Sequence, residues 1–150
     1  MAEHLLFVGM MGAGKTTVAR LVAARLGRPH VDTDEEVERV TGSSVGAIFS
    51  ARGEGGFRLE ESQVVATVVG ADVPSVVSVG GGAVLDDANR AALRAAGTVV
   101  WLRARPGTLA RRVGSNAGKN YRAFVSHGPF QLQTTVLNLE QGDSRSGQNK

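Results

Sequence analysis

The chain has 150 residues, of which 42% are hydrophobic and 21% are charged, and it contains no cysteine. This length suits one domain with a buried core, and we expect residues 1–150 to form it. The lack of cysteine excludes a disulfide framework, a thiolate metal site and a catalytic thiol, and it favours a reducing compartment. A net charge of only +3 gives no reason to expect nucleic acid as a partner.

The N-terminal apolar run is short and leads into strand and loop signals. Leu5 to Val8 is too short for the core of a signal peptide or for a membrane-spanning helix. We therefore expect no leader, no membrane partner and a soluble cytoplasmic protein. Residues 4–8 predict a buried parallel strand that ends at Gly9. Apolar side chains spaced by three and four residues between Val18 and Leu26 then predict a helix over 15–26.

Further strands and helices alternate along the chain. Residues 30–32 predict a second strand, and a helix opens at Thr33 or Asp34 with Val37 and Val40 facing the core. The remaining expected elements are helices over 45–52 and 57–69 separated by glycines, a strand over 75–79, a helix over 86–96, a strand over 98–102, a helix from Pro106 to about Val113, and a strand over 134–139. This alternation predicts an α/β fold, with helices on both faces of a parallel sheet.

The composition of the chain changes at about Gly114. Asn and Gln number two in residues 1–114 and eight in the last 36 residues. Residues 141–150 contain no core-forming side chain. We therefore expect residues 115–150 to be atypical and partly disordered.

A phosphate-binding loop is the strongest motif in the sequence. Residues 9–16 match the pattern of glycine, four residues, glycine, lysine, then serine or threonine. A turn between a buried strand and a helix start aims backbone N–H groups at one point, where the helix dipole adds positive potential. Lys15 would reach the β- and γ-phosphates, and the Thr16 hydroxyl would bind Mg²⁺.

Two carboxylates follow the second strand. Asp32 and Asp34 stand at the sheet edge that faces the ligand in a doubly wound sheet. Asp32 is a candidate to hold the metal through water, and Asp34 is a candidate to accept the proton of a substrate hydroxyl. Taken alone, the pair is equally consistent with a helix N-cap followed by an acid in the first turn.

One arginine and a glycine turn complete the candidate site. Arg58 follows Phe57, and Glu61 lies three residues further along the same helix face, where it could hold the guanidinium for an anionic substrate. An ordinary surface ion pair is the alternative interpretation. Gly80 to Gly82 follow a predicted strand and offer N–H groups near the same edge, although three glycines are also typical of a flexible turn.

Together these four motifs, in this order and spacing, resemble the shikimate kinase family over residues 4 to about 114. The resemblance implies a three-layer α/β/α phosphate-loop kinase with a parallel sheet of order 2-3-1-4-5. It implies transfer of the ATP γ-phosphate to the 3-hydroxyl of shikimate, with Mg²⁺ as cofactor and ATP and shikimate as small-molecule partners, in a protein that is usually a monomer.

The resemblance also implies roles for individual residues. Lys15 and Asp34 would be catalytic, and Thr16 and Asp32 would serve the metal. The ATP-binding residues would be Gly12, Ala13, Gly14, Lys15, Thr16, Thr17, Arg112 and Lys119. The shikimate-binding residues would be Asp34, Phe49, Phe57, Arg58, Glu61, Gly80, Gly81 and Gly82.

The chain departs from the family pattern after Arg112. Shikimate kinases carry a lid with an Arg-Pro-Leu-Leu-like segment and then a helix that supplies a second substrate arginine, and residues 115–150 match neither. Lys119 stands near the expected lid arginine, but a lysine cannot form the same two-pronged contact. Two alternatives therefore stay open: a catalytically impaired nucleotide-binding module of this family, and another small-metabolite kinase such as a gluconate kinase.

Overall fold

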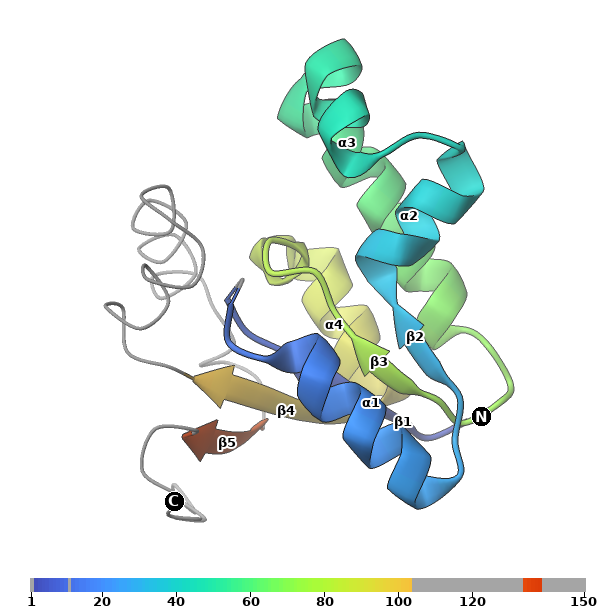
Figure 1. The fold of residues 1–150 in the computed structure, drawn as a ribbon, viewed down its shortest axis with the longest axis vertical. Helices are drawn as coiled ribbons and strands as arrows, with labels where there is room; N and C mark the ends of the chain where they lie inside the picture. The colour runs from blue at the N-terminus through green and yellow to red at the C-terminus, as the bar shows by residue number, and fades with distance from the viewer. Residues whose placement is uncertain (1, 11, 104–133, 139–150) are drawn as a thin grey trace.

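A five-stranded parallel sheet forms the centre of the molecule. The computed structural model describes residues 2–10, 12–103 and 134–138. Its strands are β1 (His4–Val8), β2 (His30–Asp32), β3 (Val76–Ser78), β4 (Gly97–Arg103) and β5 (Thr134–Asn138). They run in the order β2-β3-β1-β4-β5, and every neighbouring pair is parallel (Figure 1). The expected fold class and strand order are confirmed.

Helices cover both faces of this sheet. They are α1 (Lys15–Leu26), α2 (Thr33–Thr41), α3 (Val45–Val69) and α4 (Asp87–Ala96), with a short 3₁₀ helix η1 (Ala83–Leu85) before α4. Figure 1 shows α1 in front of the sheet and α4 behind it, while α3 packs against both α2 and α4. Most residues of β1, β3 and β4 are buried because of this double cover, which explains why residues 5–8 and 76–77 are apolar.

Small side chains, not large ones, form the buried face of α1. Ala19 and Ala23 are almost fully buried, whereas Leu21 and Leu26 are 63% and 51% exposed. Val18 and Val22 of the same helix are partly buried and pack against the same core. On α2, Val37 is buried as expected, but the expectation that Val40 faces the core is wrong, because its side chain is 59% exposed.

The glycines in the middle of α3 do not form the expected linker over residues 53–56. Only Gly53 leaves the helical conformation, with φ 69° and ψ −175°, so the break is a kink at a single residue. Gly55 and Gly56 continue the helix. An ion pair between Arg52 and Glu60, at 2.7 Å, spans the kink. A second, smaller core lies here, where Phe57 packs with Val37, Ile48 and Val64.

The parallel strands bring three loops to one edge of the sheet. Because β3 lies between β2 and β1, the turn after β3 lies between the loop after β1 and the start of α2. The expected strand near residue 134 is present as β5. The helix expected from Pro106 to Val113 lies outside the described residues.

Candidate active site

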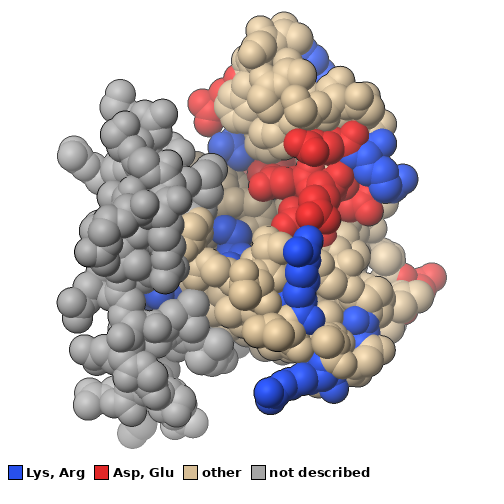
Figure 2. Space-filling model, in the orientation of Figure 1, with Lys and Arg blue, Asp and Glu red and all other residues tan. Residues whose placement is uncertain are grey.

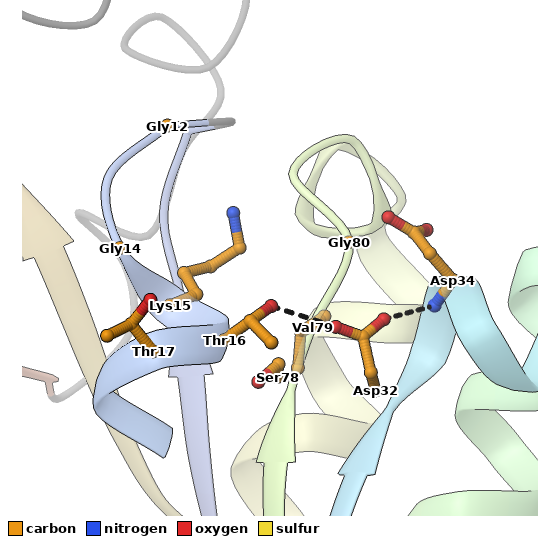
Figure 3. A pocket seen from close by; sticks show the side chains of 10 residues that line it. All are labelled: Gly12, Gly14, Lys15, Thr16, Thr17, Asp32, Asp34, Ser78, Val79 and Gly80. Atoms are coloured by element: carbon orange, nitrogen blue, oxygen red, sulfur yellow. Dashed lines mark hydrogen bonds between the residues drawn. The ribbon is translucent and has the colours of Figure 1, made fainter. Parts of the chain in front are cut away.

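A cavity of about 250 Å³ opens at this edge of the sheet. We call residues 9, 10 and 12–17 its first wall, and Asp34 with the turn Gly80–Gly82 its second wall, against which Arg58 and Glu61 lie. The cavity is lined by Gly12, Gly14, Lys15, Thr16, Thr17, Asp32, Asp34, Ser78, Val79 and Gly80 (Figure 3). The structure therefore brings together the phosphate loop, the acidic pair and the glycine turn expected from the sequence.

The first wall is built from backbone. Gly14 precedes α1 in the left-handed conformation, with φ 92° and ψ 18°, and no side chain caps the helix. Gly12 also has a positive φ of 83°, so both positions favour glycine. An uncapped helix start is a site for an anion. Ala13 takes part differently: its side chain is buried in the core, and its N–H donates to the Met10 carbonyl at 3.0 Å.

Lys15 points into the space between the two walls (Figure 3). Its Nζ donates to the carbonyl oxygens of Gly9 at 2.7 Å and Met10 at 3.0 Å. Burial lowers the pKa of Lys15 to about 8, against the opposing effect of Asp34 and Asp32. Within the described part of the chain, the buried ammonium group is therefore paired only with two neutral carbonyl oxygens. A bound polyanion would stabilise its charged form.

Asp32 connects the start of α2 to α1. Its Oδ2 accepts a hydrogen bond from the Thr16 hydroxyl at 2.9 Å, and its Oδ1 accepts from the backbone N–H groups of Asp34 and Glu35 (Figure 3). Asp32 is therefore the N-cap of α2 and also a partner of Thr16. The N-cap interpretation is therefore correct, and the second carboxylate oxygen of Asp32 contacts Thr16, while the metal-holding role of Asp32 stays a prediction.

Asp34 lies against Gly80. A Cβ added at Gly80 would be 2.7 Å from Asp34 Oδ1 and 2.8 Å from Glu61 Oε1, so both carboxylates close on this glycine. Burial raises the pKa of Asp34, Asp32 raises it further, and Lys15 and Arg58 oppose the rise. Acidic side chains gather over α2, the helix that carries Asp34 (Figure 2). A carboxylate with a raised pKa is suited to accept a proton.

Arg58 is held by the carboxylates of its own helix. Its Nη1 donates to Glu61 Oε2 at 2.7 Å, and its Nη2 lies 3.5 Å from Glu54 Oε1. Glu61 is only 1% exposed, and burial raises its pKa against the lowering effect of Arg58. A side chain at Gly82 would overlap the Arg58 guanidinium. The ion pair expected from the spacing is present, and it lies against the glycine turn.

Neither phenylalanine is among the residues that line the cavity, and Phe57 lies beside Arg58. The rings of Phe49 and Phe57 are 4.8 Å apart between centroids, and the Arg58 guanidinium carbon is 5.3 Å from the Phe57 ring centroid. Phe57 is buried in the smaller core, while Phe49 is 38% exposed. Arg112 and Lys119, expected on the nucleotide side, lie outside the described residues.

Two residues at or next to the cavity have no counterpart among the expected site residues. Ser78 lines the cavity at the end of β3, and its hydroxyl lies 2.8 Å from His30 Nε2. Thr33 is buried, and its hydroxyl accepts a hydrogen bond from the Gly80 N–H. Thr33 stands between two acids already singled out in the sequence, which was the available signal for it.

The described helices include none that is long and apolar enough to cross a membrane.

Comparison with known proteins identifies the family. The family model for shikimate kinase matches residues 11–140, so the match continues past the change in composition near Gly114. A shikimate kinase of Symbiobacterium thermophilum is 53% identical over 129 residues, covering 86% of this chain and 72% of that protein. One of Nitrosomonas europaea is 37% identical over 93% of this chain and 71% of its own. A shikimate kinase of Burkholderia thailandensis is 48% identical over 106 residues, which cover 71% of this chain and 57% of that protein.

Solved structures agree with this assignment. A shikimate kinase of Acinetobacter baumannii in complex with shikimate superposes with a TM-score of 0.80 at 30% identity, over 97% of this chain and 88% of that one. A gluconokinase of Sinorhizobium meliloti shares the fold, with a TM-score of 0.62 at 16% identity, over 93% of this chain and 83% of its own. The chain belongs to the shikimate kinase family.

Proposed function

We propose that this chain transfers the γ-phosphoryl group of ATP to the 3-hydroxyl of shikimate. The observation that carries the proposal is the pair of facing walls. One side of the cavity presents an uncapped helix start with Lys15, and the other presents Asp34 beside a glycine turn that contacts Arg58. A phosphate cradle that faces a proton acceptor and an arginine suits a kinase whose second substrate is a small carboxylated polyol.

The reaction follows from the positions of the side chains. Lys15 would leave the carbonyls of Gly9 and Met10 and contact the β- and γ-phosphates, where its charge stabilises the transferred group. The substrate hydroxyl oxygen forms a bond to the γ-phosphorus while the bond to the ADP oxygen breaks and ADP leaves with that electron pair. The hydroxyl proton passes to Asp34, whose raised pKa favours this step.

The chain also offers ligands for Mg²⁺. Among the described residues no group of three or more His, Cys, Asp or Glu side chains could hold a metal by itself. The Thr16 hydroxyl and the Asp32 carboxylate, in contact at 2.9 Å, form an all-oxygen pair, which fits an ion that takes most of its ligands from water and phosphate. Mg²⁺ bound there would neutralise charge on the phosphate oxygens.

Arg58 is the proposed anchor of the shikimate carboxylate. Its guanidinium keeps N–H donors beyond those used by Glu61 and Glu54, and a planar fork suits a carboxylate. Phe49 and Phe57 would border this subsite through their contact with each other and with Arg58. For Arg112 and Lys119 we propose contacts with the nucleotide, on the sequence resemblance.

Turnover by the full chain tests the proposal. ADP release is measured with MgATP and shikimate, and the phosphorylated product is identified by ³¹P NMR. Asp34→Asn should lower kcat by about 10²- to 10⁴-fold while ADP still binds, because the proton acceptor is lost. Asp87→Asn is the matched control, since Asp87 is 91% exposed and pairs with Arg90 on α4.

The other outcomes separate the alternatives. Nucleotide binding without turnover would identify an impaired nucleotide-binding module. Phosphorylation of gluconate, with shikimate inert, would identify a different small-metabolite kinase.

A further inference from the structure

Thr33 lies between Asp32 and Asp34 in the sequence, but its side chain is buried and contacts the backbone of the glycine turn. It is the first residue of α2, after the N-cap Asp32 and before Asp34. Its side chain is 1% exposed, and its Oγ1 accepts a hydrogen bond from the Gly80 N–H at 2.8 Å in a buried position. Asp32 thus connects the start of α2 to the first wall through Thr16, and Thr33 connects it to the second wall.

The glycine turn has few other fixed points. Val79, directly after β3, donates its N–H to the Phe7 carbonyl of β1. The carbonyls of Gly80 and Gly82 accept from the N–H groups of Ala83 and Leu85, each at 3.1 Å, and neither bond involves the Gly80 amide. Three consecutive glycines permit many backbone conformations. The bond to Thr33 is therefore the contact that fixes the amide of the first glycine after the strand.

The position of Gly80 sets the geometry of the second wall. Asp34 Oδ1 and Glu61 Oε1 both approach the place where a Gly80 Cβ would stand, and Arg58 lies against Gly82 in the same turn. A shift of the turn would change the distance between Asp34 and the Arg58–Glu61 pair. Gly80 therefore helps to set the distance between Asp34 on α2 and the Arg58–Glu61 pair on α3.

We propose that Thr33 is a positioning residue, which holds the Gly80 turn at a fixed distance from Asp34 and so aligns the proton acceptor with the substrate held at Arg58. This inference rests on the proposed function, because it assigns Thr33 a part in that same reaction. Thr33 touches no reacting atom. Its hydroxyl acts through the backbone of Gly80 and through its neighbour Asp34.

The test replaces the hydroxyl while keeping the shape of the side chain. In Thr33→Val the Gly80 N–H loses its acceptor, and kcat for shikimate should fall by about 10- to 100-fold, because small misplacements of reacting groups cost this much. ADP affinity should stay within about twofold, since the first wall is unchanged. Thr33→Ser keeps an acceptor and should restore kcat.

Hydrogen exchange of the Gly80 amide gives a readout that does not depend on turnover. We expect fast exchange in Thr33→Val and protection in both the wild type and Thr33→Ser. Thr41→Val is the matched control: Thr41 ends the same helix, and its hydroxyl donates to the Val37 carbonyl at 2.7 Å, away from the cavity. It should leave kcat and Gly80 exchange unchanged. Should Thr33→Val not fold, Thr33→Ala removes the same acceptor without placing a methyl group against the N–H.

Each other result counts against the inference. If the wild type is active and Thr33→Val has the same kcat, the inference on Thr33 is wrong and the proposed function stands. The same holds if kcat of Thr33→Ser is no higher than that of Thr33→Val. Loss of ADP affinity together with kcat would show a general structural role and also overturn it. A wild-type chain without shikimate-dependent turnover overturns the proposed function, and the catalytic part of this inference falls with it.

Discussion

The two walls of the cavity are built in different ways. The first wall comes from one short segment of the chain around the uncapped start of α1, and Lys15 is the charged side chain it adds. The second wall combines Asp34 of α2 with the turn after β3, and the Arg58–Glu61 ion pair of α3 lies against it. A backbone cradle suits any phosphate chain, whereas placed side chains suit one particular small molecule. Damage to the first wall should therefore affect all nucleotide chemistry, and damage to the second should affect one substrate.

Among the variants that compare the two walls, Lys15→Met should have the largest effect, and it should impair the function of the first wall alone. We expect kcat to fall by about 10²- to 10³-fold, because a donor to the transferred phosphoryl group is lost. The melting temperature should stay close to that of the wild type, since removing a desolvated ammonium offsets the loss of its hydrogen bonds to Gly9 and Met10. Coupled ADP release and thermal unfolding measure the two effects. A large fall in melting temperature would contradict this account of Lys15.

Arg58→Lys should impair shikimate binding at the second wall and leave nucleotide binding at the first wall unchanged. The charge is kept but the planar fork is lost, so the KM for shikimate should rise by about 10- to 100-fold while ADP affinity is unchanged. Arg52→Lys is the matched control on the same helix, because Arg52 is exposed and pairs with Glu60. Steady-state kinetics and ADP titration check both variants. Equal KM values for the two variants would show that Arg58 is not the substrate anchor.

The pH dependence of nucleotide binding tests the first wall. The pKa of Lys15 is about 8, and the charged form binds phosphates. ADP affinity should be constant below this pH and weaken by about tenfold per pH unit well above it. At pH 8, calorimetry in buffers of different ionisation enthalpy should show proton uptake on binding. Lys15→Met should show neither effect.

The lowered pKa of Lys15 also predicts how the free energy of unfolding changes with pH. The folded protein releases the Lys15 proton at about pH 8, whereas the unfolded chain keeps it to about 10.5. The cost of burying the ammonium is therefore present below pH 8 and disappears as the pH rises from 8 to 10.5. Within this window, the free energy of unfolding of the wild type should rise relative to that of Lys15→Met.

A pair of glycine substitutions should show the smallest effects and sharpen the description of the second wall. Gly80→Ala places a Cβ against Asp34 and Glu61 and should lower the free energy of unfolding by about 1–3 kcal/mol. Gly55→Ala, in open space on α3, should raise it by about 0.5–1 kcal/mol. Urea unfolding measures both. Stabilisation by both alanines would mean that the turn is not packed against the two carboxylates.

Much of the fold was open to prediction because its signals are local. Residues 4–26 carry a strand, a glycine loop and a helix, each specified by adjacent residues, and all appear as expected. The Arg58–Glu61 pair followed from helical spacing. Burial was harder to predict: Leu21 and Val40 are exposed because tertiary packing, which no local pattern encodes, decides which face of a helix is covered. On α1 the buried positions are Ala19 and Ala23. The break in α3 was placed too broadly, because three of the four residues from 53 to 56 remain helical.

The sequence by itself determined the phosphate loop, since a strand, a turn and a helix that follow one another in the chain can only place their N–H groups together. It also determined which residue types could form the second wall. Only the tertiary structure decided how they act: β3 lies between β2 and β1, which places Gly80 between Lys15 and Asp34 and gives its N–H to Thr33. A hydrogen bond between residues 47 positions apart depends on strand order, and strand order is settled by packing of the whole sheet.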